Sequence, residues 1–388
     1  MFIIDSLSHI DYWLLGALAL VMLYQCYFYC RYMMGCNRWL RRNSKKTINS
    51  TSEEYPGVSV IVCARNEENN LRNYLQALLT QDYPCYEVIV VNDGSEDDTQ
   101  MVLEQYMRQY KHLYVTFVPR EARIISSKKL ALTIGVKAAH YDYLLLTDAD
   151  CRPESRYWIR DMARGFCGND GKTEVVLGYG AYFSQKSLLN SLINYDTLFI
   201  GLQYMGMAVA GKAYMGVGRN LAYKRETFFN HSGFRGLLGE RAGDDDLFVN
   251  KIVTRENTQI VCTPDSITWS VPKASWREWF HQKRRHLSVS PHYKTASKVQ
   301  LTIEPLTRGL FYALLIAIFV FGSGWAMVGA YALWCVRLIL QLCVINTSSR
   351  RLGGQLFGIE IVLYEIVLPL VSAYLLATHP WYKKRMHW

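Results

Sequence analysis

Tyr143-Leu-Leu-Leu-Thr-Asp148-Ala-Asp150-Cys-Arg-Pro153 lies near the middle of the 388-residue chain and decides how its fold is read. The three leucines form a short apolar run, which is typical of a strand covered on both faces. Two carboxylates one residue apart end this run, at the edge where a parallel sheet usually opens its ligand crevice. The pattern predicts a metal site at the end of a strand. A loop or turn is the alternative, and the flanking sequence distinguishes the two.

Strand and helix patterns alternate on the N-terminal side of this run. Buried-strand patterns occupy residues 57–63, 86–91 and 115–119, and each is followed by a helical pattern, the third over 131–139. Such alternation predicts a mostly parallel sheet with helices on both faces. Right-handed crossovers bring the carboxyl ends of the strands to one edge. We therefore expect the acids that follow these strands to lie close together, namely Glu67, Asp93, Asp148 and Asp150.

The two ends of the chain are apolar. Residues 12–30 form an uncharged run of about 19 residues, which is about the length that spans a hydrocarbon core. Asp5 and Asp11 precede it in place of a basic segment, which favours an uncleaved anchor over a signal peptide. The basic residues that follow place the central domain in the cytoplasm by the positive-inside rule: Arg31, Arg38, Arg41, Arg42, Lys45 and Lys46.

Further apolar stretches cover residues 310–345, interrupted at Gly322-Ser-Gly324, and 356–377. They predict two or three more spans. Arg350 and Arg351 favour a cytoplasmic loop after a helical hairpin, but a third span would put the basic residues 383–385 outside, against the same rule. The number of spans stays open at this point. Charged residues inside these stretches are expected to pair, line a cavity or lie near an interface: Arg337, Glu360 and Glu365.

Composition narrows the classes of partner. The net charge of +10 is interpreted as a basic collar on anionic lipid headgroups rather than a nucleic-acid footprint. The ten cysteines are scattered and lack the paired spacing of a metal site. They are interpreted as buried thiols of a cytosolic domain and its membrane segments.

Five motifs follow one another between residues 58 and 286: Val58-Ser-Val-Ile-Val with Arg65-Asn-Glu67; Val90-Val-Asn-Asp93-Gly-Ser; Thr147-Asp148-Ala-Asp150 with Pro153; Gly243-Asp-Asp245-Asp-Leu247; and Gln282-Lys-Arg-Arg285-His286. In this order they resemble the membrane-anchored, family-2 inverting glycosyltransferases. The resemblance implies an α/β cytosolic domain of the GT-A fold, with a Rossmann-like mixed sheet, between N- and C-terminal transmembrane helices. The expected segments are an anchor over 1–32, a basic and polar linker over 33–55, the GT-A domain over 56–270, an amphipathic interface segment over 271–300, and transmembrane helices over 305–379.

For the sugar donor, the resemblance implies that Glu67 and Asp93 lie at nucleotide-binding strand ends, with Asp93 favouring uracil. Asp150 would bind a divalent metal, Mg²⁺ or Mn²⁺, and Asp148 would touch the ribose or the metal through water. Such a metal bridges two phosphates and neutralises the leaving diphosphate. One of Lys128 and Lys129, with Lys129 preferred, would contact phosphate from a segment similar to the family's Gly-Lys-X-X-Ala-Leu, although Ser127 replaces the glycine. Turn chemistry at the acids and a solvated face at the lysines remain alternatives.

For the acceptor, the resemblance implies that Asp245 takes the proton of the attacking hydroxyl and that Asp244 supports it. An acid-rich helix N-terminus is the alternative. Gly218 and Asn220 lie in a glycine-rich segment similar to the family's acceptor loop. Further on, Arg285 would neutralise the pyrophosphate and Gln282 would hold the nearby loop. His286 stands where the family usually has Trp, which weakens the case for a stacking platform and for processive extension.

These observations predict a membrane-bound, metal-dependent inverting glycosyltransferase of the hexosyltransferase type. Its donor would be a nucleotide sugar, in the first place a UDP-sugar, and its acceptor a lipid or lipid-linked glycan. We expect an integral protein of the inner or plasma membrane with its catalytic domain in the cytoplasm, and no nucleic-acid partner. A processive polysaccharide synthase and a catalytically silent, nucleotide-binding membrane scaffold are the alternatives.

Overall fold

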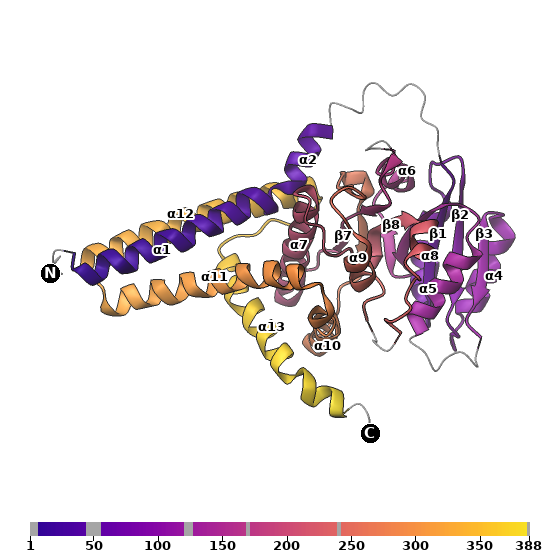
Figure 1. Ribbon diagram of the computed structural model, residues 1–388. Helices are drawn as coiled ribbons and strands as arrows, with labels where there is room; N and C mark the ends of the chain where they lie inside the picture. The colour runs from indigo at the N-terminus through magenta and orange to yellow at the C-terminus, as the bar shows by residue number, and fades with distance from the viewer. Residues whose placement is uncertain (1–6, 44–55, 120–126, 168–170, 239–241, 386–388) are drawn as a thin grey trace.

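A seven-stranded mixed sheet forms the centre of the domain between the apolar ends of the chain (Figure 1). The computed structural model describes residues 7–43, 56–119, 127–167, 171–238 and 242–385. In spatial order the strands are β3 (Leu113–Phe117), β2 (Tyr86–Asn92), β1 (Val58–Ala64), β4 (Tyr143–Asp148), β8 (Leu221–Lys224), β6 (Val175–Leu177) and β9 (Thr258–Ile260). The first four are parallel, as the alternating pattern predicts, and β8 pairs antiparallel with both β4 and β6.

A second sheet begins directly after the aspartate pair. Its strands are β5 (Cys151–Pro153), β10 (Thr268–Ser270) and β7 (Gly180–Tyr182), with β10 in the middle. Because β4 ends at Asp148 and β5 starts at Cys151, the chain passes from one sheet to the other at this pair. The carboxylates therefore lie at a junction between sheets.

Alternation along β1 explains why helices cover both faces of the main sheet. Ile61 packs against α5 (Ser127–Ala138), where a side chain at Gly135 would collide with it. Val60 and Val62 point the other way, into the cluster formed with α3 (Glu68–Leu79) and α4 (Thr99–Gln109). Successive side chains of a strand point to opposite faces, so a strand buried on both sides needs an unbroken apolar run. The other domain helices are α6 (Trp158–Arg164), α8 (Arg225–Asn230), α9 (Asp246–Ile252) and α10 (Trp276–Leu287), with short 3₁₀ turns η4 (Gly218–Asn220), η5 (Pro264–Ser266) and η6 (Ser290–His292).

Within the described residues, four helical segments are long and apolar enough to cross a membrane. The helices concerned are α1 (His9–Phe28), continued by η1 (Tyr29–Met33) and α2 (Gly35–Asn43), then α11 (Thr295–Phe321), α12 (Gly324–Arg351) and α13 (Glu360–Arg385). Helices α1, α11 and α12 run side by side, whereas α13 turns away from them (Figure 1). Arg337 and Glu365 are buried and form a two-pronged ion pair with N to O distances of 2.6 and 2.8 Å.

One long helix of the domain, α7 (Leu188–Val209), joins the sheets to the apolar helices. It crosses η1 so closely that a Cβ atom at Gly206 would lie 1.8 Å from the carbonyl oxygen of Tyr32. On another side Asp196 of α7 binds the ammonium group of Lys283 on α10, with both carboxylate oxygens 2.6 Å from Nζ. The domain is thus packed directly onto the apolar helices.

Candidate active site

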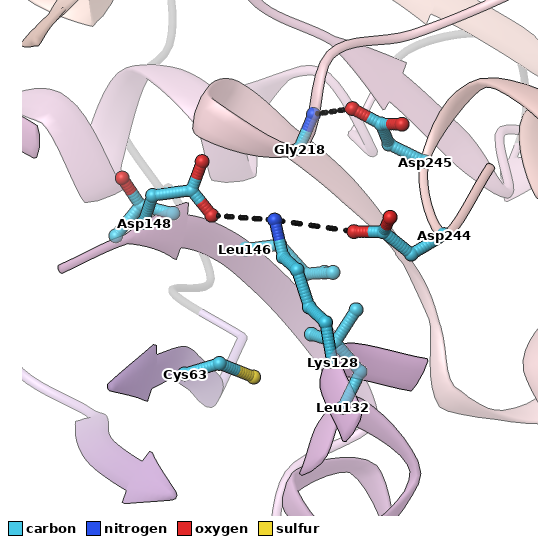
Figure 2. Close-up of a pocket in the computed structure, with 9 residues that line it drawn as sticks. Cys63, Lys128, Leu132, Leu146, Asp148, Gly218, Asp244 and Asp245 are labelled. Atoms are coloured by element: carbon cyan, nitrogen blue, oxygen red, sulfur yellow. Dashed lines mark hydrogen bonds and ion pairs between the residues drawn. The ribbon is translucent and has the colours of Figure 1, made fainter. Parts of the chain in front are cut away.

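Lys128 links acids from two distant parts of the sequence. Its Nζ atom lies 2.9 Å from Oδ1 of Asp148 and 3.1 Å from Oδ2 of Asp244, in a pocket that Asp245 and Gly218 also line (Figure 2). Desolvation works to lower the pKa of Lys128, but the carboxylates of Asp148 and Asp244 outweigh it and raise the pKa well above its usual value. The lysine is therefore a permanent cation between the end of β4 and the start of α9.

Asp245 is fixed by backbone amides. Its Oδ2 accepts a hydrogen bond of 2.7 Å from the amide of Gly218, and its Oδ1 accepts one of 2.8 Å from the amide of Asp246, so that it also caps α9. Gly243 just before it has a φ of +90°, a conformation that favours glycine. Burial, together with the neighbouring charge of Asp244, raises the pKa of Asp245. The cap and the raised pKa occur in the same side chain, so the two interpretations of this acid do not exclude each other.

Asp244 and Asp246 differ from Asp245 in their surroundings. Burial alone would raise the pKa of Asp244, but the ammonium group of Lys128 lowers it. Asp246 instead turns into the protein, where Tyr293 donates a hydrogen bond of 2.9 Å to its Oδ2. Burial and the charge of Asp245 raise the pKa of Asp246 to about 8. Of the three acids, Asp244 and Asp245 line the pocket, whereas Asp246 is bound by Tyr293 inside the protein.

Asp148 and Asp150 have the chemistry of a site for a hard divalent cation. Ligand atoms of Asp148, Asp150 and Cys151 lie within 4.8 Å of one another. Cys151 is an unsuitable ligand, because burial raises the pKa of its thiol and the sulfur lies 2.9 Å from the hydroxyl of Ser270. Burial, and then the charge of Asp148, raises the pKa of Asp150, a penalty that a bound cation would remove. The two carboxylates fit Mg²⁺ or Mn²⁺, which prefer oxygen ligands.

Asp93 and Glu67 follow the ends of β2 and β1. Asp93 is 4% exposed, and its Oδ1 has no hydrogen-bond partner among the described residues. A buried acceptor without a partner is costly unless a ligand supplies the donor. Glu67 accepts a hydrogen bond of 2.6 Å from Asn70, and burial raises its pKa, with added contributions from Asp150 and Asp148. Gly94 has a φ of +64°, which lets the chain turn beside these acids.

Gly218 and Asn220 of the glycine-rich segment differ in what their polar groups contact. The amide of Gly218 points at Asp245, as described above, but Asn220 is fully buried and its side chain is used within the protein. Its amide donates to the carbonyls of Tyr179 and Ser266, and its oxygen accepts from the indole of Trp158. Asn220 thus holds strands and loops together, and the structure leaves it no free polar group for a substrate.

Gln282 and Arg285 lie on α10, beside the second sheet. Gln282 donates a hydrogen bond of 2.9 Å to the hydroxyl of Tyr182 at the end of β7. Arg285 is exposed and close enough to Asp244 to contribute to lowering its pKa. His286 is also exposed, without an aromatic partner among the ring contacts of the described residues.

Lys129 requires a correction. Its Nζ donates hydrogen bonds to the carbonyls of Leu237 and Ala242 at 2.8 and 2.6 Å, so this buried lysine binds main-chain groups within the protein. Lys128, its neighbour, reaches the pocket instead. The sequence motifs did not single out Arg219. Arg219 lies over the ring of Tyr182 at 4.2 Å and donates to the carbonyl of Ala181, and a cation within a glycine-rich loop was the signal that could have found it.

A comparison with family models finds a match over most of the chain. A family model described as glycosyl transferase family 21 matches residues 18–388. The motifs resembled family 2, whereas the matching model is that of family 21; the expected class, a nucleotide-sugar glycosyltransferase with a GT-A-like fold, holds for it.

Curated relatives are similar over part of their length. The probable glycosyltransferase YdaM of Bacillus subtilis is 28% identical over 239 residues, which is 60% of this chain and 55% of that protein. A poly-beta-1,6-N-acetyl-D-glucosamine synthase of Staphylococcus aureus is 28% identical over 204 residues, 52% of this chain and 44% of that protein. The chain thus spans about half the length of these relatives.

Among solved structures, the mannosyltransferase PcManGT from Pyrobaculum calidifontis, in complex with GDP-Man and Mn²⁺, is similar with a TM-score of 0.52 and 19% identity. The similarity covers 92% of this chain and 98% of that one. At this identity the comparison shows a shared fold.

Proposed function

The chain belongs to glycosyl transferase family 21, and from this premise we propose that it is a membrane-bound, metal-dependent inverting glycosyltransferase. Its donor is a nucleotide diphosphate sugar, in the first place a UDP-sugar, and its acceptor is a lipid or lipid-linked glycan. The observation that carries the proposal is the bridge from Asp148 through Lys128 to Asp244. Acids assigned to the donor and acids assigned to the acceptor share one pocket, so a sugar bound there would contact both.

The donor half rests on the strand ends. Asp93 offers a buried, unpartnered carboxylate oxygen to an N–H group of the donor's base. Asp150 and Asp148 would hold the divalent metal, which when bound neutralises charge on the leaving diphosphate. Lys128 lies beside Asp148 and adds a fixed positive charge on the same side of the pocket. A cation there stabilises a phosphate oxygen as negative charge develops on it.

The acceptor half rests on Asp245. Inversion needs a base on the face opposite the leaving nucleotide. The two amide hydrogen bonds fix the orientation of this carboxylate, and a carboxylate with two accepted bonds still has lone pairs for a hydroxyl proton. Its raised pKa makes it a stronger base than an ordinary aspartate. Asp244, neutralised by Lys128, supports the site electrostatically.

A lipid acceptor is supported by the packing of the domain on helices that are long and apolar enough to cross a membrane. The protein would then lie in an inner or plasma membrane. Its pocket would face the cytoplasm, where nucleotide sugars occur. One observation favours the processive alternative, because a relative of this chain is a polysaccharide synthase by name. His286, exposed where the related motif has Trp, favours single transfer instead.

The test uses full-length protein purified in detergent and returned to lipid vesicles. It is incubated with a panel of UDP- and GDP-sugars, with Mn²⁺ or with a chelator, and nucleotide release is measured. We expect release with one donor, dependent on metal and on added lipid, and lost in Asp150→Ala. Asp82→Asn, an exposed acid outside the site, is the matched control. Release by Asp150→Ala at the wild-type rate would refute the metal assignment, and long polymer as product would establish the processive alternative.

A further inference from the structure

The last helix, α13, has the length and composition of a membrane span but does not pack like one. Its most extensive contacts are with α10 and α7 of the domain, and it meets α12 only near its start through the Glu365–Arg337 pair, whereas α1 packs along α11 and α12 (Figure 1). We propose that α13 is re-entrant: it starts inside the bilayer, returns to the cytoplasmic face without crossing, and lies there with one face in lipid. This rests on the proposed orientation of the chain, with the domain in the cytoplasm.

The start of α13 lies deep because the chain folds back along α12. Residues after Arg351 contact progressively earlier residues of α12. Gln355 contacts Ser349, Phe357 contacts Asn346, and Glu365 contacts Arg337. Arg337 is 14 residues before Arg351, which at 1.5 Å per residue is about 21 Å along the helix. Glu365 therefore lies about 21 Å from the cytoplasmic end of α12, measured along that helix.

The other end of α13 lies at the cytoplasmic face. Thr378 accepts a hydrogen bond from the guanidinium of Arg284 on α10, and two residues earlier on α10 Gln282 binds Tyr182 of the second sheet. Thr378 is 13 residues beyond Glu365, or about 20 Å of helix. Had α13 continued across the bilayer, Thr378 would lie near the far end of α12, beside Gly324. Its contact with a helix that holds the catalytic domain excludes that course.

One face of α13 is exposed and apolar. Leu363, Ile366, Leu370 and Tyr374 are all more than 40% exposed, and their spacing places them on a single stripe. The opposite side is buried, through Ile361, Tyr364, Leu368 and Leu375. An exposed apolar stripe opposite a buried face fits the hydrocarbon and headgroup boundary of a bilayer.

This course also accounts for the charge pattern. With α1, α11 and α12 as the spans, the ends that carry the exposed aromatics Trp13 and Trp325 lie on the outer face. Arg350 and Arg351 lie on the cytoplasmic side, and so does the basic sequence at 383–385 if α13 returns. Three spans satisfy the positive-inside rule, where four would break it.

The first test determines which side of the membrane the C-terminus occupies. Alkaline phosphatase or green fluorescent protein is fused after Trp388 of the full chain and expressed in a bacterial inner membrane. We expect fluorescence and no phosphatase activity. The matched control inserts one known spanning helix between Trp388 and the reporter, which should reverse both signals. Phosphatase activity without the inserted helix would overturn the proposal.

The second test asks whether α13 touches lipid. Full-length protein in vesicles that contain a phospholipid with a photoactivated carbene on its acyl chain is irradiated, digested and analysed by mass spectrometry. We expect labelling of residues 363–374 together with α11 and α12, and none of α4. Unlabelled residues 363–374 would show that α13 lies outside the bilayer and would refute the proposal. Neither test reads transfer activity, so its failure leaves the proposed enzyme untouched, and an inactive enzyme leaves these results valid.

Discussion

The buried pair of Asp196 on α7 and Lys283 on α10 gives the sharpest test of how the site is held together. Both carboxylate oxygens lie 2.6 Å from Nζ, and the two side chains are only 10% and 15% exposed. Lys283 sits between Gln282 and the rest of the basic segment, so the pair positions the helix that carries Gln282 and Arg285. We predict that Asp196→Ala lowers both stability and affinity for the donor.

The size of the effect follows from burial. Removing one partner leaves a buried, unpaired ammonium group, which costs about 3–5 kcal/mol. For a domain of 150–250 residues each kcal/mol lowers the melting temperature by about 2–4 °C, so a fall of roughly 6–20 °C is expected. Displacement of α10 would also weaken the Arg285 contribution. A charged hydrogen bond is worth about 1.5–3 kcal/mol, so the KM for the donor should rise about tenfold or more.

The assay compares four proteins in one detergent: wild type, Asp196→Ala, Lys283→Ala, and the exchange of charges by Asp196→Lys with Lys283→Asp. Thermal melting and donor KM are measured for each. The exchange should recover part of both losses, because it restores an ion pair at the same place. Glu68→Ala is the control, since its pair with Arg72 is partly exposed and worth about 0–1 kcal/mol. If Asp196→Ala melts and binds donor like wild type, α10 is held by something else.

Three further predictions follow from the site and the packing. Asp245→Asn should bind nucleotide sugar with near wild-type affinity by calorimetry and lose transfer at least 100-fold, as expected for a general base; wild-type turnover would exclude Asp245. Because a base must be deprotonated and the pKa of Asp245 is raised, activity should fall with decreasing pH at a midpoint above the ordinary 3.8, and the residual activity of Asp244→Asn should fall at lower pH, since one cause of the shift is gone. Gly206→Ala should destabilise by about 1–3 kcal/mol or prevent folding, because its Cβ would meet the backbone of Tyr32, whereas Gly309→Ala, with open space around it, should melt like wild type.

The parts of the fold that depend on local pattern were predictable. The strands β1, β2 and β4 fall within one or two residues of their apolar runs, because a strand buried on both faces leaves an unbroken signature in the sequence. The antiparallel strand β8 left no such signature, since it is only four residues long and directly follows the glycine-rich segment. Its pairing with β4 depends on a contact between residues about 75 positions apart.

Side-chain direction explains the errors within the site. Lys128 and Lys129 are adjacent on a helix and therefore point about 100° apart, so only one can reach the pocket. Which one does so depends on how α5 lies against the sheet. Asn220 has the composition of a ligand residue, but its partners Tyr179, Ser266 and Trp158 come from three separate segments. Sequence spacing carries no record of such contacts. The positions of motifs at strand ends were easier to predict than those of Lys129 and Asn220, because neighbouring parallel strands end at the same edge of a sheet.

The crossing of α7 and η1 at Gly206 has a consequence for the choice of acceptor. Backbone meets backbone there, with no side chain to compress, so the domain is held at a fixed position relative to the apolar helices. If the chain acts on a lipid as proposed, a lipid would be a substrate only when its hydroxyl reaches the level of Asp245 while its chains stay in the membrane. Selection among lipids would then act through the length of the headgroup as well as through its chemistry.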